Sequence, residues 1–193
     1  MRSDEGLAAV RIGPPEVLNG QIQLDPYNPE WPRLFEGEEA RIRATLGDRV
    51  LLLEHVGSTS VPGLSAKPRI DMVLGLADSS DEPAYVPPME AAGYVLRIRE
   101  PVWHQHRVFK GPDTDVNLHV HTIGCSEIER MRRFRDHLRA NEGDRMLYER
   151  TKQDLAQRTW KYTQHYADAK SAVVEEIVER AGGPARDSHC ELY

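Results

Sequence analysis

Apolar residues recur along the chain at two different spacings, and these spacings predict the order of its elements. After Pro32, which suits the first turn of a helix, a helical spacing predicts a helix over residues 32–46. Short apolar runs then predict extended segments. These strands are expected at residues 50–56, 69–76, 94–98, 106–110 and 115–121. A short helix over residues 87–92 is expected to interrupt them.

Helical spacing returns after the last of these strands. Three helices are expected, over residues 126–141, 143–159 and 162–181. Ser126 and Glu129 have the spacing of a capping box at the start of the first. This order of helix, strands and helices predicts an α/β (α+β) fold, with a mixed sheet, flanking helices and a C-terminal helical part.

Glycine and proline clusters divide the chain into three parts. Residues 1–20 are expected to form a loosely held, flexible arm, because Gly13-Pro14-Pro15 blocks regular structure. Residues 21–183 form one domain, with a strand-rich core over about 50–121 and a helical part over about 126–181. Residues 184–193 are expected to be a frayed tail after the last helix.

Composition narrows the environment in which the chain works. The net charge of −6 gives the protein as a whole no attraction to nucleic acid, and no apolar run is long enough to cross a membrane. The N-terminus lacks the apolar segment of a secretory signal. Cys125 and Cys190 lie far apart and lack metal-ligand spacing, which indicates free thiols in a reducing compartment. We therefore expect a cytoplasmic protein whose partners are small molecules.

The segment between the first two strands has the strongest chemical signal. An apolar run leads into a turn of small residues, Gly57-Ser58-Thr59-Ser60, and Asp71 follows on the next strand after Lys67. The amides and hydroxyls of such a turn can face a phosphate, and a carboxylate beside it can hold a metal ion. The plainer alternative is that the glycines allow tight turns and that Asp71 caps backbone amides.

Strand alternation selects further candidates. Asp115, Asn117, His119 and His121 share one face of their strand, and the apolar residues between them share the other. The polar face is expected to line a groove. Two imidazoles on one strand face can bind a metal ion, although paired surface histidines are more common.

Charged residues near the glycine turn are candidates for holding a phosphate. Asp71 lies among apolar neighbours and needs a partner, which a metal ion, Lys67 or Arg69 would supply. Arg132, Arg135 and Arg139 form one stripe on a later helix. This stripe is either a solvated face or a second place to hold a phosphate.

The segment from His55 to Asp71 resembles the hallmark of the GrpB family. Other stretches of the chain resemble the family too. They are Trp31-Pro32 with Phe35, residues 117–120, residues 134–139, Tyr148 with Lys152, and Tyr166 with Lys170-Ser171. The resemblance covers roughly residues 21–181. It implies a nucleotidyltransferase-like fold, and in some bacteria this domain is fused to dephospho-CoA kinase.

The resemblance also implies a reaction class. Nucleotidyltransferases hold a nucleoside triphosphate at a Gly-Ser turn and bind Mg²⁺, or Mn²⁺ in its place, through acids on adjoining strands. Carried over, Gly57 and Ser58 are the phosphate turn and Asp71 is a metal-binding acid. The nucleotidyltransferase superfamily usually places a second acid two residues after the first, where this chain has Val73. The other metal-ligand candidates are Glu54, Asp115 and His119.

Three hypotheses for function follow. The first is an enzyme that transfers a nucleotidyl group from a nucleoside triphosphate, with ATP expected, to a small molecule, or that makes an acyl-adenylate for ligation. His119 or His121 would be its general base, and Lys67, Arg69 or Arg135 would neutralise charge. The C-terminal helical part would shape the acceptor pocket with Tyr148, Lys152, Tyr166 and Lys170. The second is a nucleotide- or phosphate-binding module without turnover. The third is a metal-dependent hydrolase built on His119 and His121.

Overall fold

The computed structural model describes residues 4–13 and 17–185. Its helices are α1 (Asp4–Val10), α2 (Glu30–Leu46), α3 (Glu82–Ala91), α4 (Ser126–Ala140), α5 (Glu142–Ala156), α6 (Thr163–Ala169) and α7 (Ser171–Arg180), with short 3-10 turns η1 (Gly47–Arg49) and η2 (Ser58–Ser60). Its strands are β1 (Val17–Gly20), β2 (Leu52–Val56), β3 (Ile70–Leu76), β4 (Val95–Glu100), β5 (His106–Lys110), β6 (Val116–Thr122) and β7 (Trp160–Tyr162).

Five strands form a mixed sheet in the order β2-β3-β6-β5-β4. The central pair, β3 and β6, runs parallel, and the other neighbouring strands run antiparallel. In the parallel pair Asp71 lies opposite Asn117, and Val73 lies opposite His119. This register places Asp71 beside Asn117, on the face of each strand to which alternation assigns them.

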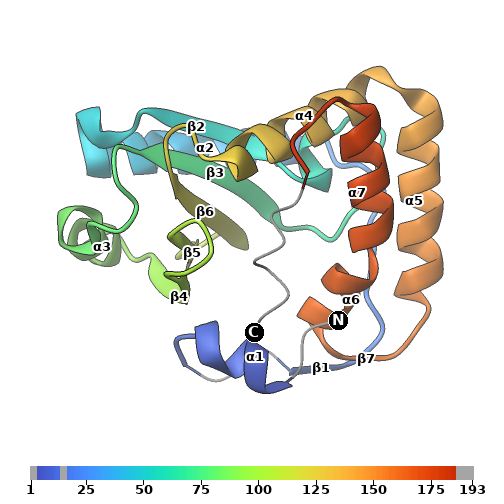
Figure 1. Cartoon of the computed structure of the whole chain (residues 1–193), viewed down its shortest axis with the longest axis horizontal. Coiled ribbons are helices and arrows are strands. Elements are labelled where there is room, and N and C mark those ends of the chain that lie inside the picture. Colours follow the sequence, from blue (N-terminus) through green and yellow to red (C-terminus); the bar gives the residue numbers. More distant parts are fainter. Residues whose placement is uncertain (1–3, 14–16, 186–193) are drawn as a thin grey trace.

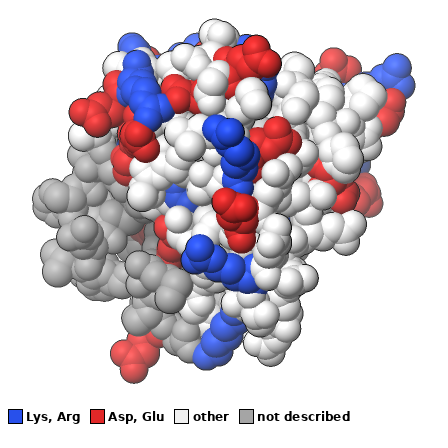
Figure 2. All heavy atoms as spheres, turned by 90° about the vertical axis from the view of Figure 1, so that its right-hand side faces the viewer, with Lys and Arg blue, Asp and Glu red and all other residues white. Residues whose placement is uncertain are grey.

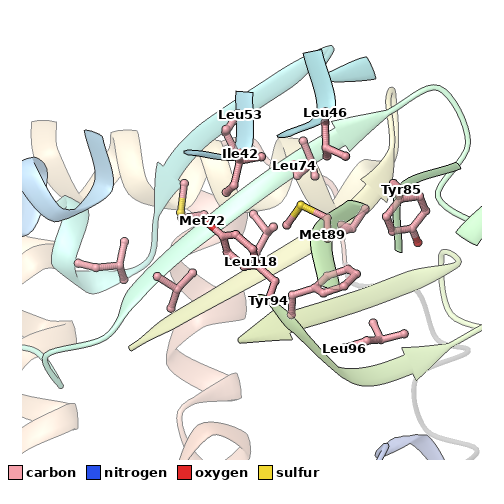
Figure 3. Packing of buried hydrophobic residues seen from close by; sticks show 14 of the residues in the cluster. Ile42, Leu46, Leu53, Met72, Leu74, Tyr85, Met89, Tyr94, Leu96 and Leu118 are labelled. Carbon is pink, nitrogen blue, oxygen red and sulfur yellow. The ribbon is translucent and has the colours of Figure 1, made fainter. Parts of the chain in front are cut away.

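The two faces of this sheet differ in character. One face carries the main apolar core, in which Ile42 and Leu46 of α2 and Met89 of α3 pack on Met72 and Leu74 of β3 (Figure 3). These residues are fully or almost fully buried. Helix α4 contacts β2 and β3 and covers part of the opposite face, which carries Asp71. The predicted α/β (α+β) fold, with a mixed sheet and flanking helices, is therefore confirmed.

The C-terminal helices α5, α6 and α7 stand together beside the sheet (Figure 1). Phe134 and Leu138 of α4 pack against Tyr148 of α5 and Ile177 of α7, and Leu64 joins this second core from the loop after η2. The helical part and the glycine turn are thereby fixed to each other by shared apolar contacts. This packing carries side chains of α5 and α6 to the polar face of the sheet.

The N-terminal segment differs from the prediction. Residues 1–20 were expected to lack regular structure, yet they contain α1 and β1. Strand β1 pairs with β7 in a two-stranded sheet, and Arg11 bridges to Ile98 of β4. The chain outside the described residues includes Pro14, Pro15 and most of the predicted tail, together with Cys190.

Helix boundaries and one predicted cap also differ from the prediction. The predicted helix over residues 162–181 is divided into α6 and α7, and β7 precedes it. Helix α3 begins at Glu82 rather than at Pro87, with Pro83 in its first turn. The capping box at Ser126 does not form: Cys125 is the N-cap residue of α4, and no side chain caps that end. Strands β1 and β7 are too short to show a periodic pattern in the sequence. They are stabilised by pairing with each other.

The surface over the C-terminal helices carries charges of both signs. Lysine and arginine lie among aspartate and glutamate on this face, with no large area of one sign (Figure 2). Within the described residues, no helix combines the length and the apolar character needed to cross a membrane.

Candidate functional site

A carboxylate and a glycine turn face each other at the end of β2. Val56, the last residue of β2, pairs with Asp71 of β3, and Gly57 then begins the turn into η2. The Asp71 Oδ1 atom accepts a hydrogen bond of 2.8 Å from the Asn117 side-chain amide. A Cβ atom on Gly57 would lie only 2.5 Å from the other carboxylate oxygen, Oδ2. Glycine is therefore required for this close approach.

The hydroxyls of the turn serve mainly the turn itself. Ser60 Oγ donates to the Gly57 carbonyl at 2.6 Å, and Thr59 Oγ1 donates to the Arg69 carbonyl at 3.1 Å. The amides of Ser60 and Val61 bond to carbonyls of the same turn. Thr59 and Ser60 are buried, and Ser58 is half-buried. Ser58 and Thr59 line the adjoining cavity, and Ser60 does not.

The turn and Asp71 line a cavity of about 340 Å³ between the sheet and the C-terminal helices. Four cationic side chains line it as well, namely Lys67, Arg69, Lys152 and Lys170. They come from the loop before β3, from α5 and from the residue after α6. The fold therefore brings together most of the predicted phosphate-binding residues around one predicted metal-binding acid.

Lys152, Lys170 and Tyr166 line the helical wall of the cavity, whereas Tyr148 contacts both lysines without lining it. Lys152 is almost fully buried, with its Nζ atom donating to the Ser65 carbonyl and lying 4.9 Å from the centre of the Tyr148 ring. Lys170 Nζ lies 4.8 Å from the centre of the Tyr166 ring. Burial, with the charge of Lys170, lowers the pKa of Lys152 to about 7. The buried Tyr166 hydroxyl has no hydrogen-bond partner among the described residues.

The position of the missing second acid is closed by apolar side chains. Val73 is fully buried and packs with Val56 of β2 and Ile128 of α4, with Met131 beside them. Glu54 faces the same side of the sheet, because it pairs with Val73 in the register. Asp71 is therefore the one acid on β3 at this site, where the nucleotidyltransferase superfamily usually has two.

Replacing Val73 with aspartate is expected to destabilise the protein rather than to create a second metal ligand. The substitution would place a charge among Val56, Ile128 and Met131 without a partner. A buried and unpaired carboxylate lowers the free energy of unfolding by about 3 kcal/mol or more. Chemical denaturation compares wild type with Val73→Asp, and Val73→Ala gives the loss of packing alone. Equal stability of the two variants would contradict this account.

The arginine stripe of α4 is directed toward the strand end and the turn. Arg132 and Arg135 pair with Glu54 at 3.0 and 2.7 Å, and Arg135 also donates to the His55 carbonyl. Arg139 donates twice to the Ser60 carbonyl, at 3.1 and 2.8 Å. Glu54 is thus paired with two arginines and does not line the cavity. None of the three arginines lines the cavity, so phosphate binding by Arg135 and metal binding by Glu54 stay predictions.

The substitution Arg135→Met is expected to lower stability more than it lowers ligand binding. It would remove a partly buried hydrogen bond to Glu54 and a buried one to the His55 carbonyl. Hydrogen bonds to charged groups contribute about 1.5–3 kcal/mol, so we expect a loss of this order. Denaturant unfolding measures the loss. The exposed Arg33→Met on α2 is the control.

Asp115 is held by cations instead of pointing into the cavity as a free ligand. Both of its carboxylate oxygens lie 2.9 Å from Arg69 Nε, and Lys110 Nζ lies 3.2 Å from Oδ1. Burial works in the opposite direction, but these two cations hold the pKa of Asp115 below its usual value. The predicted role of Asp115 in metal binding has no support from this geometry.

Histidines form a hydrogen-bonded row behind Asn117. His119 Nδ1 lies 3.0 Å from His106 Nε2, and His106 Nδ1 lies 2.7 Å from Glu100 Oε2. The ring of His121 stacks on His106 at 4.6 Å and is fully buried, so it does not reach the cavity. Burial first, and the neighbouring His106 ring second, lower the pKa of His119 to about 4.

Some of these residues could not be selected from the sequence. His106 lies on a predicted strand, whereas Glu100 lies two residues beyond the predicted end of β4, and their pairing depends on the register of β4, β5 and β6. Thr163 and Gln164 line the cavity from the start of α6, whose approach to the sheet depends on tertiary packing. The sequence signal for His106 is alternation along β5, which places His106, Val108 and Lys110 on one face.

A mixed sheet flanked by helices, with an acid beside a glycine turn in a cavity lined by cations, is consistent with the nucleotidyltransferase-like superfamily. The chain belongs to the GrpB family, because the family model described as GrpB protein matches residues 21–180.

Relatives agree with this assignment. The chain is 59% identical to a UPF0157 protein of Halalkalibacterium halodurans, over 93% of this chain and 92% of that one. A UPF0157 protein of Streptomyces coelicolor is 43% identical, with 91% of each chain covered. The crystal structure of GrpB from Enterococcus faecalis superposes with a TM-score of 0.73 and 30% identity, over 82% of this chain and 96% of that one. A dephospho-CoA kinase of Mycolicibacterium paratuberculosis is 24% identical over 86% of this chain and 47% of its own length.

Proposed function

We propose that the protein binds a nucleoside triphosphate, with ATP expected, together with Mg²⁺ and transfers its nucleotidyl group to a small-molecule acceptor. One observation carries the proposal. The carboxylate of Asp71 lies against the glycine turn in a cavity that four cationic side chains also line. Such a cavity suits a ligand with several negative charges, and a carboxylate beside it suits a metal ion that accompanies the phosphates.

The residues present fit Mg²⁺ only when phosphate oxygens complete its coordination. Among the described residues no group of three or more histidine, cysteine or acidic side chains could hold a metal ion. Mg²⁺ is commonly bound through one or two carboxylates and the phosphates of the substrate, so Asp71 would supply the carboxylate ligand from the protein. When bound, the ion would stabilise the charge that develops on the phosphates. Mn²⁺ has similar ligand preferences and would serve as a substitute.

The surrounding side chains have separate roles in this proposal. Ser58 and the start of η2 would contact the phosphates, with Lys67 and Lys170 neutralising their charge. Asn117 would hold Asp71 in place through its side-chain amide. The acyl-adenylate reaction with subsequent ligation would use the same nucleotide site and differs only in the acceptor.

The second candidate is a binding module without turnover, and the burial of Val73 favours it. A site with one strand carboxylate binds a metal ion more weakly than a site with several, and α4 closes the place of the second. The hydrolase on His119 and His121 has no comparable support, because His121 is buried and His119 Nδ1 faces His106.

An assay with ATP labelled at the α-phosphorus tests the first candidate against the second. The protein is incubated with labelled ATP, Mg²⁺ and a low-molecular-mass cell extract as the source of acceptors. The proposal expects label in a new compound together with pyrophosphate. Asp71→Asn should abolish both products, and Asp154→Asn, an exposed position on α5, should retain them. ATP binding without transfer of label would instead establish the binding module.

A further inference from the structure

A second hollow of about 670 Å³ lies next to the nucleotide cavity. The two share Asn117, His119 and Gln164 in their linings, so His119 stands at the boundary between them. Beyond this boundary the second hollow is lined by Arg11, Arg97 and Trp103. A molecule in this hollow would therefore lie beside the nucleotide and contact the same imidazole.

The hydrogen bonds behind His119 determine which of its nitrogen atoms carries a proton. The Glu100 carboxylate can only accept, so His106 donates to it from Nδ1 at 2.7 Å. With His106 in its neutral form, Nε2 carries a lone pair and accepts from His119 Nδ1 at 3.0 Å. Since a neutral imidazole has one proton, His119 Nε2 also carries a lone pair. Within the described residues no group hydrogen-bonds to this Nε2 atom.

The charges around the second hollow favour an anionic occupant. Its two acids are already engaged, since Glu100 bonds to His106 and Asp115 lies between Arg69 and Lys110. Arg11 and Arg97 have no acidic partner in the part of the chain that the structure describes. These two guanidinium groups suit a carboxylate or a phosphate.

Backbone strain lies in the loop that forms one side of the hollow. His104 and Gln105 have positive φ angles of 52° and 49°, which side-chain-bearing residues rarely adopt. The loop places the Trp103 ring 5.1 Å from the ring of His106, measured between ring centres. Strain of this kind is often retained where it positions functional groups.

We propose that the second hollow binds the acceptor of the nucleotidyl group, and that the acceptor is a small hydroxyl compound with one anionic group. The inference rests on the proposed function and specifies its second substrate. His119 would act as the base at Nε2, with His106 and Glu100 as positioning residues. Asp71 of β3 and Lys110 of β5 are the other charged groups that act on His119.

The step balances without a further reactant. His119 Nε2 takes the proton of the acceptor hydroxyl, and the electron pair of that oxygen forms a bond to the α-phosphorus. The bond from the α-phosphorus to its bridging oxygen breaks, and pyrophosphate leaves with that electron pair. The proton on His119 is afterwards released to solvent.

Nitrogen-15 NMR of the histidine rings tests the positioning chain without any nucleotide. The inference expects His119 and His106 in wild type to be protonated at Nδ1 and unprotonated at Nε2. Glu100→Leu removes the acceptor of the chain and should give mixed tautomers at both rings, whereas Glu100→Gln retains an accepting oxygen and should preserve them. A proton on Nε2 of His119 in wild type would overturn the assignment.

Fluorescence of Trp103 tests the acceptor class, with D-glycerate and glycerol as matched probes. Glycerate carries a carboxylate and hydroxyls, and glycerol carries hydroxyls alone. We expect glycerate to change the emission and glycerol to have no effect, with the response lost in Trp103→Phe and weakened about tenfold or more in Arg97→Gln. Equal responses to both probes, or no response to either, would overturn the anionic class. Because neither test uses ATP, failure here is distinguishable from failure of nucleotide binding.

Discussion

Replacing Gly57 with alanine is expected to lower stability and to abolish Mg²⁺-dependent nucleotide binding at once. The residue has φ of 70° and ψ of −173°, a region that is essentially restricted to glycine and costs other residues about 1–3 kcal/mol. The new Cβ atom would also lie 2.5 Å from Asp71 Oδ2, so the carboxylate or the turn must move. Both effects act on the contact that the proposed site depends on.

A second glycine separates backbone strain from displacement of the carboxylate. Gly63 has φ of 78°, and a Cβ atom there would meet nothing within 4 Å. We expect Gly63→Ala to lose stability by a similar amount while it keeps nucleotide binding. Thermal unfolding and ATP titration of the two variants make the comparison. If Gly63→Ala lost binding as completely as Gly57→Ala, the contact with Asp71 would not be the cause.

The charge of Lys152 is expected to make nucleotide binding depend on pH near neutrality. Burial lowers the pKa of this lysine to about 7, so its positive charge disappears as the pH rises through that value. Nucleotide affinity should therefore be higher below about pH 7 than above it. The ATP titration is repeated across this range on wild type and on Lys152→Met.

The ratio of the ATP affinities of wild type and Lys152→Met cancels the effect of protonation of ATP itself, because both proteins are titrated with the same nucleotide. We expect wild type to bind about tenfold or more tightly than Lys152→Met at low pH, and the difference to diminish above about pH 7. Lys161→Met, at an exposed position, is the control and should behave as wild type. A ratio that does not change with pH would show that Lys152 does not contact the phosphates through its charge.

The same lowered pKa has a consequence for stability, with a sign that follows from proton binding. Unfolded lysine has a pKa of about 10.4, so between about pH 7 and pH 10.4 the unfolded chain binds a proton that the folded chain releases. Stability from this group is therefore lowest below about pH 7 and increases as pH rises through the window. Denaturation of wild type and Lys152→Met at several pH values measures this difference.

Much of the central sheet follows from local pattern. The run from Leu52 to Val56 and the alternation around His119 predict strands and assign the correct faces, because one side of each strand must join an apolar core. Asp71 and Asn117 are also placed on the polar face by alternation alone. The hydrogen bond between them cannot be predicted from alternation, since it requires the parallel register of β3 and β6.

The errors occur where a distant contact determines the structure. Residues 17–20 form a strand only because Val17 pairs with Tyr162, more than a hundred positions later. Arg135 belongs to a helical stripe that suits a phosphate, yet its partners are Glu54 and the His55 carbonyl of the sheet edge. A sequence pattern shows which residues share a face, whereas the partner of a charged side chain depends on which element packs against that face.

ATP binding with and without Mg²⁺ tests the central claim most directly. Isothermal titration of wild type, Asp71→Asn and Asp154→Asn, each with Mg²⁺ and with a chelator, gives the affinity in every case. The account predicts one site whose affinity rises with Mg²⁺ by about tenfold or more in wild type and in Asp154→Asn, and does not rise in Asp71→Asn. Equal Mg²⁺ dependence in all three proteins, or no ATP binding by wild type, would contradict the proposed site.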